Sequence, residues 1–167
     1  MRERQAVQGA RRAQEFEAFV AGAAGRLLHT ATLLTAEAPD ANPRARRLLT
    51  LALARTYASW DRLRGEDPYD RTRACLAVRF AHRAWHQYGA LGRARPHPGS
   101  ALAELTPQER LVVVLRLYEG VPEEQTAALL GLPAERVHAL CDRATATLLH
   151  PARPAATAVT GARMAAS

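Results

Sequence analysis

The sequence contains no lysine, so arginine supplies all 23 of its basic residues. Aromatic residues make up only 5% of the chain against 48% hydrophobic residues, so the core must consist mainly of leucine, alanine and valine. Such a composition suits helices that cross at small side chains. The two cysteines, Cys75 and Cys141, do not form a CxxC pair. The simple interpretation is a protein of a reduced, cytoplasmic setting.

Several features that indicate other protein classes are missing. No run of about 18 apolar residues is present to span a bilayer, and residues 1–19 lack the apolar segment of a signal peptide. We therefore expect a cytoplasmic location and no membrane partner. No Ser-His-Asp set, paired carboxylate site or glycine-rich phosphate loop is evident, so we expect neither an enzyme nor a bound cofactor.

The chain is basic, with a formal net charge of +7, but its charge is unevenly distributed. Residues 41–95 hold 12 arginines against four acids, whereas residues 96–150 hold four arginines against seven acids. A net positive charge favours an anionic partner. Because cations that neutralise phosphates supply most of the non-specific affinity for DNA, the first segment is better equipped to hold phosphates than the second.

Helical periodicity runs through most of the chain. Apolar residues recur at three- and four-residue steps over 14–35, 44–64 and 69–88, which predicts three helices. We predict an all-α fold of two small helical domains joined by a flexible linker, the second containing a helix-turn-helix. The expected bounds are a flexible N-terminus at 1–13, a first domain at 14–88, a glycine- and proline-rich linker at 89–104, a second domain at 105–149 and a disordered tail at 150–167.

The second domain is expected to begin with a capped helix. Thr106 takes the N-cap position, Pro107 the first helical position and Glu109 the capping-box position.

The stretch from 122 to 140 has the residue sizes of a helix-turn-helix. Ala127 supplies the small side chain where two helices cross, Gly131 the residue that tolerates positive φ in the turn, and Val137 the branched side chain that packs on the first helix. Pro122 and Pro133 mark the starts of the two helices. An ordinary helical hairpin is the alternative interpretation.

Three blocks resemble, in the same order, the extracytoplasmic-function sigma factors of bacterial RNA polymerase. They are FEAFVAGAAGRLLHTATLLTAE, similar to the first helix of actinobacterial members, ALARTYASWDRLRGEDPYDRTRACLAV, similar to the polymerase-binding and promoter-melting helices, and LTPQERLVVVLRLYEGVPEEQTAALLG, similar to the domain that reads the upstream promoter element. The resemblance implies core RNA polymerase and promoter DNA as partners, with an anti-sigma factor as a further partner class.

The resemblance implies a polymerase-binding surface at Arg46, Arg47, Leu48, Thr50 and Leu51. Family members usually carry acids here that dock on a basic coiled coil of the polymerase. In this chain two of these acids are replaced by Arg46 and Arg47, and a third by Leu51. Because like charges repel across an interface, this replacement weakens docking in the usual pose.

The resemblance also implies two DNA-binding surfaces. The upstream element would be read by Glu135, Arg136, His138, Ala139 and Arg143, with Arg136 the best candidate for a guanine contact unless it pairs with a surface glutamate. The downstream element would face the third helix. Its residues Arg71, Arg73, Arg79, Arg83 and Trp85 could hold a DNA strand through phosphate contacts and stacking, or form a solvated basic face.

One cluster has metal-ligand spacing. Cys75, His82 and His86 share a helical face, and the two histidines are four residues apart. A further ligand such as His97 would have to fold back to complete a site. A buried cysteine beside two histidines of a basic face is the simpler interpretation, so we expect no metal.

Two other functions compete with a promoter-specificity subunit. One is a sigma-like protein that acts through a protein partner without initiating transcription. It would use the apolar surface of 48–53 or the DNA-reading helix, in which the resemblance places His138 and Leu140 where family members usually have a lysine and an arginine. The other is a stand-alone helix-turn-helix regulator that binds DNA as a dimer, which predicts a palindromic site with half-sites about one helical turn apart.

Overall fold

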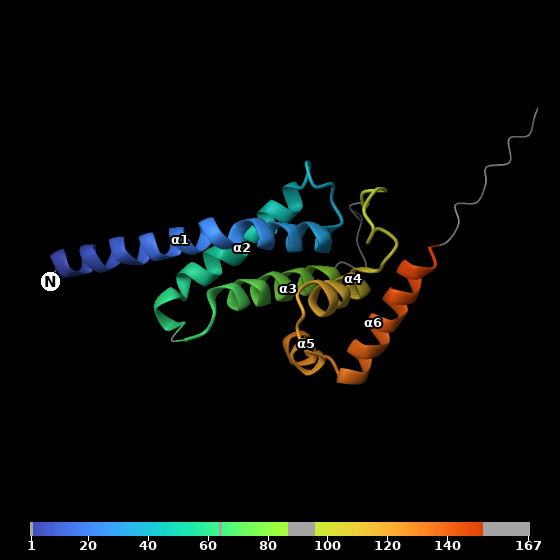
Figure 1. Cartoon of the computed structure of the whole chain (residues 1–167). Helices are drawn as coiled ribbons and strands as arrows, with labels where there is room; N and C mark the ends of the chain where they lie inside the picture. The colour runs from blue at the N-terminus through green and yellow to red at the C-terminus, as the bar shows by residue number, and fades with distance from the viewer. Residues whose placement is uncertain (1, 64, 87–95, 152–167) are drawn as a thin grey trace, which may run out of the picture.

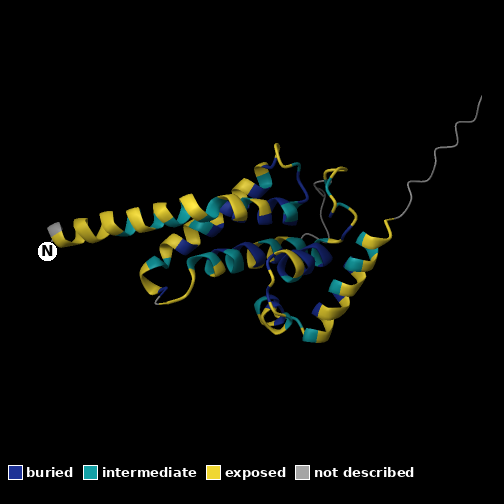
Figure 2. Ribbon diagram, viewed as in Figure 1, coloured by how far each residue is buried: buried dark blue, intermediate teal, exposed yellow. Residues whose placement is uncertain are grey.

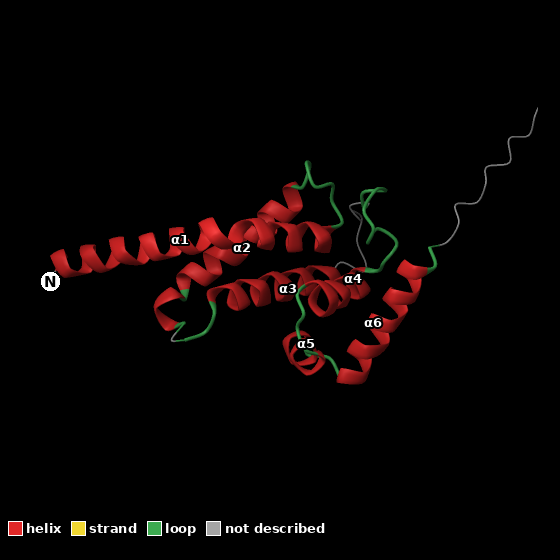
Figure 3. Ribbon diagram, in the orientation of Figure 1, coloured by secondary structure: helices red, strands yellow, loops and turns green. Residues whose placement is uncertain are grey.

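The computed structural model describes residues 2–63, 65–86 and 96–151, and the regular secondary structure of this part is all helical, with loops between the helices (Figures 1 and 3), which confirms the predicted fold class. The helices are α1 (Arg2–Thr35), α2 (Pro43–Ala58), α3 (Pro68–His86), α4 (Pro107–Val113), α5 (Glu123–Leu130) and α6 (Ala134–Leu149), with a 3₁₀ turn η1 (Trp60–Arg62) and a π-helical segment η2 (Val114–Tyr118) that continues α4. We call α1–α3 the N-terminal lobe and α4–α6 the C-terminal lobe.

Helix α1 is longer than the sequence pattern indicates. We predicted a flexible segment over 1–13, but α1 begins at Arg2 and its first turns extend away from the rest of the molecule (Figure 1). These turns are rich in alanine, arginine, glutamine and glutamate, all of which favour helix without tertiary contacts. Arg11 and Glu15 add an exposed ion pair at i, i+4 spacing. Phe16 then packs edge-on against Trp60, with ring centroids 5.1 Å apart.

The N-terminal lobe is built around leucines and alanines. Leu27, Leu34, Leu48 and Leu76 are buried where α1, α2 and α3 meet. The hydroxyls of Thr56 on α2 and Thr72 on α3 lie 2.9 Å apart in this interior, so each polar group finds its partner across the helix crossing. This packing places α2 and α3 side by side along most of their length.

The first turn of α2 is held by a carboxylate. Glu37 accepts hydrogen bonds from the backbone N–H groups of Arg44 (3.1 Å) and Ala45 (2.7 Å) and from the Arg44 guanidinium (3.0 Å). Burial alone would raise the pKa of Glu37, but these donors outweigh it and the pKa is lowered. A negative charge at a helix N-terminus is stabilising, so Glu37 fixes where α2 starts.

The two lobes share one buried ionic cluster centred on Glu119. Its side chain is fully buried and accepts hydrogen bonds from the hydroxyls of Thr30 (2.5 Å) and Tyr69 (2.9 and 3.0 Å). Arg26 lies 3.3 Å and Arg73 3.7 Å from the same carboxylate. Burial, followed by the neighbouring carboxylate, raises the pKa of Tyr69 to about 12. Glu119 follows η2, while its four partners belong to α1 and α3.

A second contact between the lobes is made by a buried arginine. The Arg110 guanidinium donates to the backbone carbonyls of Leu34 (3.0 Å), Leu102 (3.2 Å) and Leu105 (3.0 Å). Burial, with a smaller contribution from Arg44, lowers the pKa of Arg110 to about 10. Arg110 thus joins the end of α1 to the segment that leads into α4.

The predicted linker at 89–104 is only partly described, because 89–95 lie outside the described residues. From residue 96 onward the segment packs on the N-terminal lobe. The His97 N–H donates to the Ala36 carbonyl (2.7 Å), and Leu102 is buried. These contacts with the N-terminal lobe order this part of the segment, although its glycine- and proline-rich sequence predicts a flexible linker. The predicted tail over 152–167 also lies outside the described residues.

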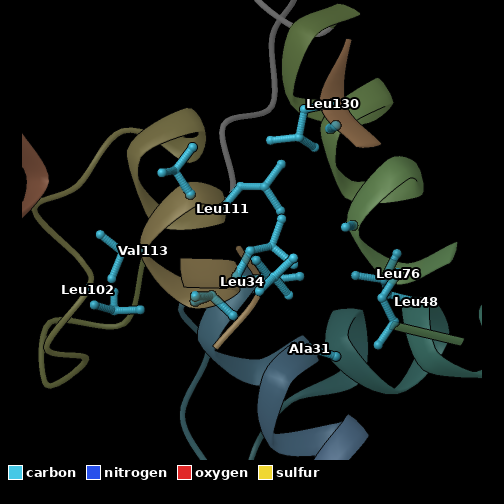
Figure 4. Packing of buried hydrophobic residues seen from close by; sticks show 14 of the residues in the cluster. Ala31, Leu34, Leu48, Leu76, Leu102, Leu111, Val113 and Leu130 are labelled. Atoms are coloured by element: carbon cyan, nitrogen blue, oxygen red, sulfur yellow. The ribbon is translucent and has the colours of Figure 1, made fainter. Parts of the chain in front are cut away.

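One hydrophobic core extends through both lobes. Leu34 and Leu76 of the N-terminal lobe and Leu111 and Leu130 of the C-terminal lobe belong to the same buried cluster (Figure 4). Buried residues concentrate where α3 and α4 approach one another, and exposed residues cover the outer turns of α1 and α6 (Figure 2). The domain bounds at 14–88 and 105–149 stay a prediction.

We predict that Glu119→Gln lowers the free energy of unfolding by about 1–3 kcal/mol, because the amide loses the charge-assisted contacts to Arg26 and Arg73. Urea unfolding of the full chain measures the effect. Glu124→Gln, an exposed change on α5, is the matched control and should leave stability unchanged within about 0.5 kcal/mol. Equal stabilities of the two variants would contradict a role for Glu119 in holding the lobes together.

Candidate nucleic-acid interface

Helices α5 and α6 form a helix-turn-helix with the geometry that the sequence predicts. Gly131 ends α5 in the left-handed conformation, with φ 64° and ψ 35°, and the Leu132 N–H donates to the Ala127 carbonyl (3.0 Å). Val137 is fully buried and Ala127 is 6% exposed at the helix crossing. The two prolines stand one residue before their helices, as N-caps rather than as first helical residues.

The face of α6 directed at solvent carries all five residues predicted to read the upstream element: Glu135, Arg136, His138, Ala139 and Arg143. Within the described residues Arg136 makes no ion pair, so the alternative in which it pairs with a surface glutamate is absent here. Leu140, which stands where family members have an arginine, is buried at 1% exposure. It packs in the core and cannot reach DNA in this arrangement.

Two of the five upstream residues already have carboxylate partners. His138 lies 3.2 Å from both Glu123 and Asp142. The Arg143 Nε donates to Glu109 Oε1 over 2.6 Å. The same glutamate closes the predicted capping box with Thr106, whose hydroxyl accepts from the Glu109 N–H. Arg143 is thereby held in one orientation against α4. Among the five residues predicted to read the upstream element, which we call the reading face of α6, Arg136 is the cation without a carboxylate partner in the described part of the chain.

The arginines of α3 divide between two faces of the helix. Arg71, Arg79 and Arg83 line a groove of about 460 Å³ between α2 and α3, together with Arg55 of α2. Arg73 instead points toward Asp70 (3.0 Å) and Glu119, on the side that meets the C-terminal lobe. Arg73 therefore lies on another side of α3 than Arg71, because residues two apart on a helix face different directions. Its contact with the downstream element stays a prediction.

Trp85, which was predicted to stack on a DNA base, is the remaining residue of the predicted downstream surface. It is half-buried and packs against the hydrophobic core, and its indole Nε1 is buried without a hydrogen-bond partner among the described residues. Its role in stacking on a base stays a prediction.

Sequence reasoning missed the part of the groove wall that comes from α2. Arg55 lies four residues after Leu51 and seven after Leu48, so helical spacing placed all three on one face. A smaller hollow of about 330 Å³ adjoins the groove and shares Arg55 and Arg71 with it, with Arg62 added. The groove and the hollow together collect five arginines: Arg55, Arg62, Arg71, Arg79 and Arg83.

The predicted polymerase-binding residues on α2 are mostly accessible. Arg46, Arg47, Thr50 and Leu51 are exposed, whereas Leu48 is 3% exposed and belongs to the core. Leu48 thus packs in the core and also lines the groove between α2 and α3, and its contact with polymerase stays a prediction. The Arg46 Nε donates to Asn42 Oδ1 (3.0 Å).

Neither a metal centre nor a membrane helix is found in the described part of the chain. Cys75 and His82 line the groove, but no group of three His, Cys, Asp or Glu side chains comes together there to hold an ion. The side chain of His86 lies outside what the structure describes. None of the described helices combines the length and apolar character that a membrane-spanning helix needs.

The C-terminal part of the chain matches a known family. Residues 101–148, which include α4, α5 and all but the last residue of α6, match the family described as Sigma-70, region 4. Over a longer stretch the chain is 30% identical to RNA polymerase sigma-E factors of Streptomyces coelicolor, Streptomyces avermitilis and Streptomyces antibioticus. These alignments cover 80% of this chain and 84%, 83% and 82% of the respective relatives. No solved structure matches the chain significantly.

The helix-turn-helix and the basic groove define a helical transcription protein whose C-terminal lobe is of the sigma-70 kind. With 30% identity over most of the length of the Streptomyces relatives, the chain belongs to the extracytoplasmic-function sigma factors of bacterial RNA polymerase. The resemblance found in its sequence blocks is confirmed.

We predict that Gly131→Ala lowers the free energy of unfolding by about 1–2 kcal/mol, because its positive φ disfavours a Cβ. Gly25→Ala, inside α1 where an added Cβ meets nothing within 4 Å, should instead raise it by about 0.5–1 kcal/mol. Thermal unfolding of both variants measures the contrast. A gain in stability at Gly131 would contradict the turn geometry.

Proposed function

We propose that this sigma factor directs core RNA polymerase to promoter DNA by presenting α6 to the upstream element and α3 to the downstream element. The observation that carries this proposal is the exposed reading face of α6, with Arg136 unpaired within the described residues, on a helix-turn-helix scaffold. As a specificity subunit the protein would catalyse no reaction itself and would act in the cytoplasm.

At the upstream element, the N-terminal turns of α6 would enter the major groove. Arg136 stands two residues after the helix begins and is free to donate both guanidinium edges to a guanine. Ala139 is one turn further and offers an apolar contact, such as one to a thymine methyl group. His138 and Arg143 would have to release their carboxylate partners, Glu123 and Glu109, before they could contact DNA phosphates.

At the downstream element, the arginines of the groove would contact the DNA backbone. Arg79 and Arg83 are exposed on successive turns of α3, and Arg71 lies two turns before Arg79 on the same side. Phosphate contacts of this kind add affinity without reading bases. They support the proposal that the basic N-terminal lobe supplies the electrostatic attraction that the acidic C-terminal lobe lacks.

Core polymerase would dock on the exposed face of α2, where Arg46, Arg47, Thr50 and Leu51 lie. A surface with two arginines cannot complement a basic partner surface, so docking would depend on the uncharged residues of this face. An anti-sigma factor is a further partner that we propose from the family, since it would have to cover one of these same surfaces.

We predict that Arg136→Ala weakens binding of the polymerase–sigma complex to its promoter by about ten- to a hundredfold, because one bidentate base contact contributes about 1–3 kcal/mol. Single-round transcription on genomic fragments with reconstituted polymerase identifies the promoter, and binding is then measured on that fragment. Arg4→Ala, on the free turns of α1, is the matched control. Unchanged promoter choice and affinity for Arg136→Ala would refute the assignment of α6.

We predict that the double charge reversal Arg46→Glu and Arg47→Glu strengthens binding to purified core polymerase by about tenfold or more, because repulsion from a basic docking surface becomes attraction. Affinity measurement with labelled sigma factor tests this, with Arg4→Glu as control. No gain would show that polymerase uses another surface. If the natural chain binds no core polymerase at all, a sigma-like protein that acts through another partner is the better account.

A further inference from the structure

A carboxylate at the start of α5 contacts two basic side chains of the C-terminal lobe. Glu123, the first residue of α5, lies 3.2 Å from Nδ1 of His138 on α6 and 3.9 Å from Nη2 of Arg116 on η2. One carboxylate oxygen, Oε2, makes both contacts. Glu123 therefore links η2, α5 and α6 through a single oxygen atom.

The imidazole of His138 is contacted by carboxylates on both of its nitrogens. Its Nε2 lies 3.2 Å from Asp142, one turn further along α6, and its Nδ1 faces Glu123. These two nitrogens are the only polar atoms of a histidine side chain. His138 is therefore 64% exposed, yet it can contact a DNA phosphate only after it loses one of the two acids.

Arg116 has a fixed stem and an accessible end. Its Nη1 donates to the Val121 carbonyl over 2.7 Å, which anchors the guanidinium beside the start of α5. Its Nε is buried without a hydrogen-bond partner in the described residues, and 28% of the side chain is exposed. Because Nη2 faces Glu123, an incoming anion would have to take the place of that carboxylate.

A purely structural role does not account for these contacts. A negative charge in the first turn of a helix is stabilising, and both Glu123 and Glu124 stand in the first turn of α5. Glu124 is exposed and makes no ion pair within the described part of the chain. It supplies the favourable charge without contacting α6 or η2, whereas Glu123 is turned toward His138 and Arg116.

The contacts of Glu123 lie where a helix-turn-helix meets the DNA backbone. In this motif the second helix enters the major groove and the first helix crosses the backbone. Phosphates are bound there by basic side chains and by the N-terminal turn of a helix. The first turn of α5 and the neighbouring His138 would form such a site, but the carboxylate of Glu123 already carries the charge that a phosphate would bring.

We propose that His138 and Arg116 form a DNA-phosphate site that Glu123 occupies in the free chain. The carboxylate competes with phosphate for the same side chains, so it lowers the affinity of the C-terminal lobe for DNA of any sequence. Because phosphate contacts carry no sequence information, removing the carboxylate strengthens binding without changing which sequence is preferred. The consequence for promoter DNA rests on the proposed function of α6, whereas the occupied site does not.

Replacing the charge of Glu123 by an amide of the same shape tests the proposal. Without polymerase, Glu123→Gln should raise the affinity of the full chain for a duplex of random sequence by about three- to tenfold near 0.1 M salt. The slope of log K against log salt concentration should steepen by about 0.9, the value of one additional phosphate contact. Anisotropy titrations of a labelled duplex at several salt concentrations measure both quantities.

Glu124→Gln is the matched control, because it removes the same charge from the neighbouring position, where the described residues offer no ion pair. Salt screens exposed charges, so this variant should change the affinity by less than about twofold and leave the slope unaltered. If Glu123 acted only on the helix dipole, the two variants would behave alike.

Second substitutions locate the phosphate site. Adding His138→Gln or Arg116→Gln to Glu123→Gln should in each case remove about half of the gain or more. Urea unfolding checks that each variant keeps its fold. Since His138 is exposed, its double variant decides the question if the Arg116 variant unfolds.

Three outcomes would overturn the proposal: an unchanged affinity for Glu123→Gln, an equal gain for Glu124→Gln, or a full gain in the double variant with His138→Gln. With reconstituted polymerase, Glu123→Gln should keep the promoter choice of the natural chain, and an altered choice would show that Glu123 reads bases instead. If the gain on random duplex is found while Arg136→Ala leaves promoter binding unchanged, the proposed function fails and the phosphate site stands.

Discussion

The buried carboxylate of Glu119 is the contact on which the arrangement of this molecule depends. A charge away from water is tolerated only when it is paired, and Glu119 finds its partners on the other lobe, in Thr30, Tyr69, Arg26 and Arg73. None of these partners lies near it in sequence. This side chain holds α4–α6 against α1–α3, together with Arg110 at the end of α1 and the hydrophobic core that both lobes share.

This attachment decides which basic residues are available. Arg73 is turned toward Glu119, whereas Arg71, Arg79 and Arg83 point away from it and line the groove with Arg55. The same packing brings Leu129 of α5 to the end of that groove. The groove therefore includes a residue of α5 only because the lobes are in contact, and it carries arginines that the proposed function assigns to promoter DNA.

Much of the scaffold was predictable because its signals are local. The capping box at Thr106 and Glu109, the left-handed glycine at Gly131 and the small residue at Ala127 each depend on neighbours within a few positions, and each was found as expected. The extent of α1 and the ordered segment 96–106 before α4 were not predicted. A run of polar helix formers in a sequence resembles a disordered end, and one of the carbonyls that accept from Arg110 belongs to Leu34, 76 residues away.

By itself, the sequence determined the all-helical class, the helix-turn-helix and the family, because helix periods, caps and turn residues act over short distances. The tertiary structure alone decided where the candidate residues lie: Arg73 beside Glu119, Trp85 against the core, Arg55 in the groove, and Leu48 and Leu140 in the core. The reason is physical. Helical spacing says which residues share a face, but only the packing of lobe on lobe says which face remains open to solvent.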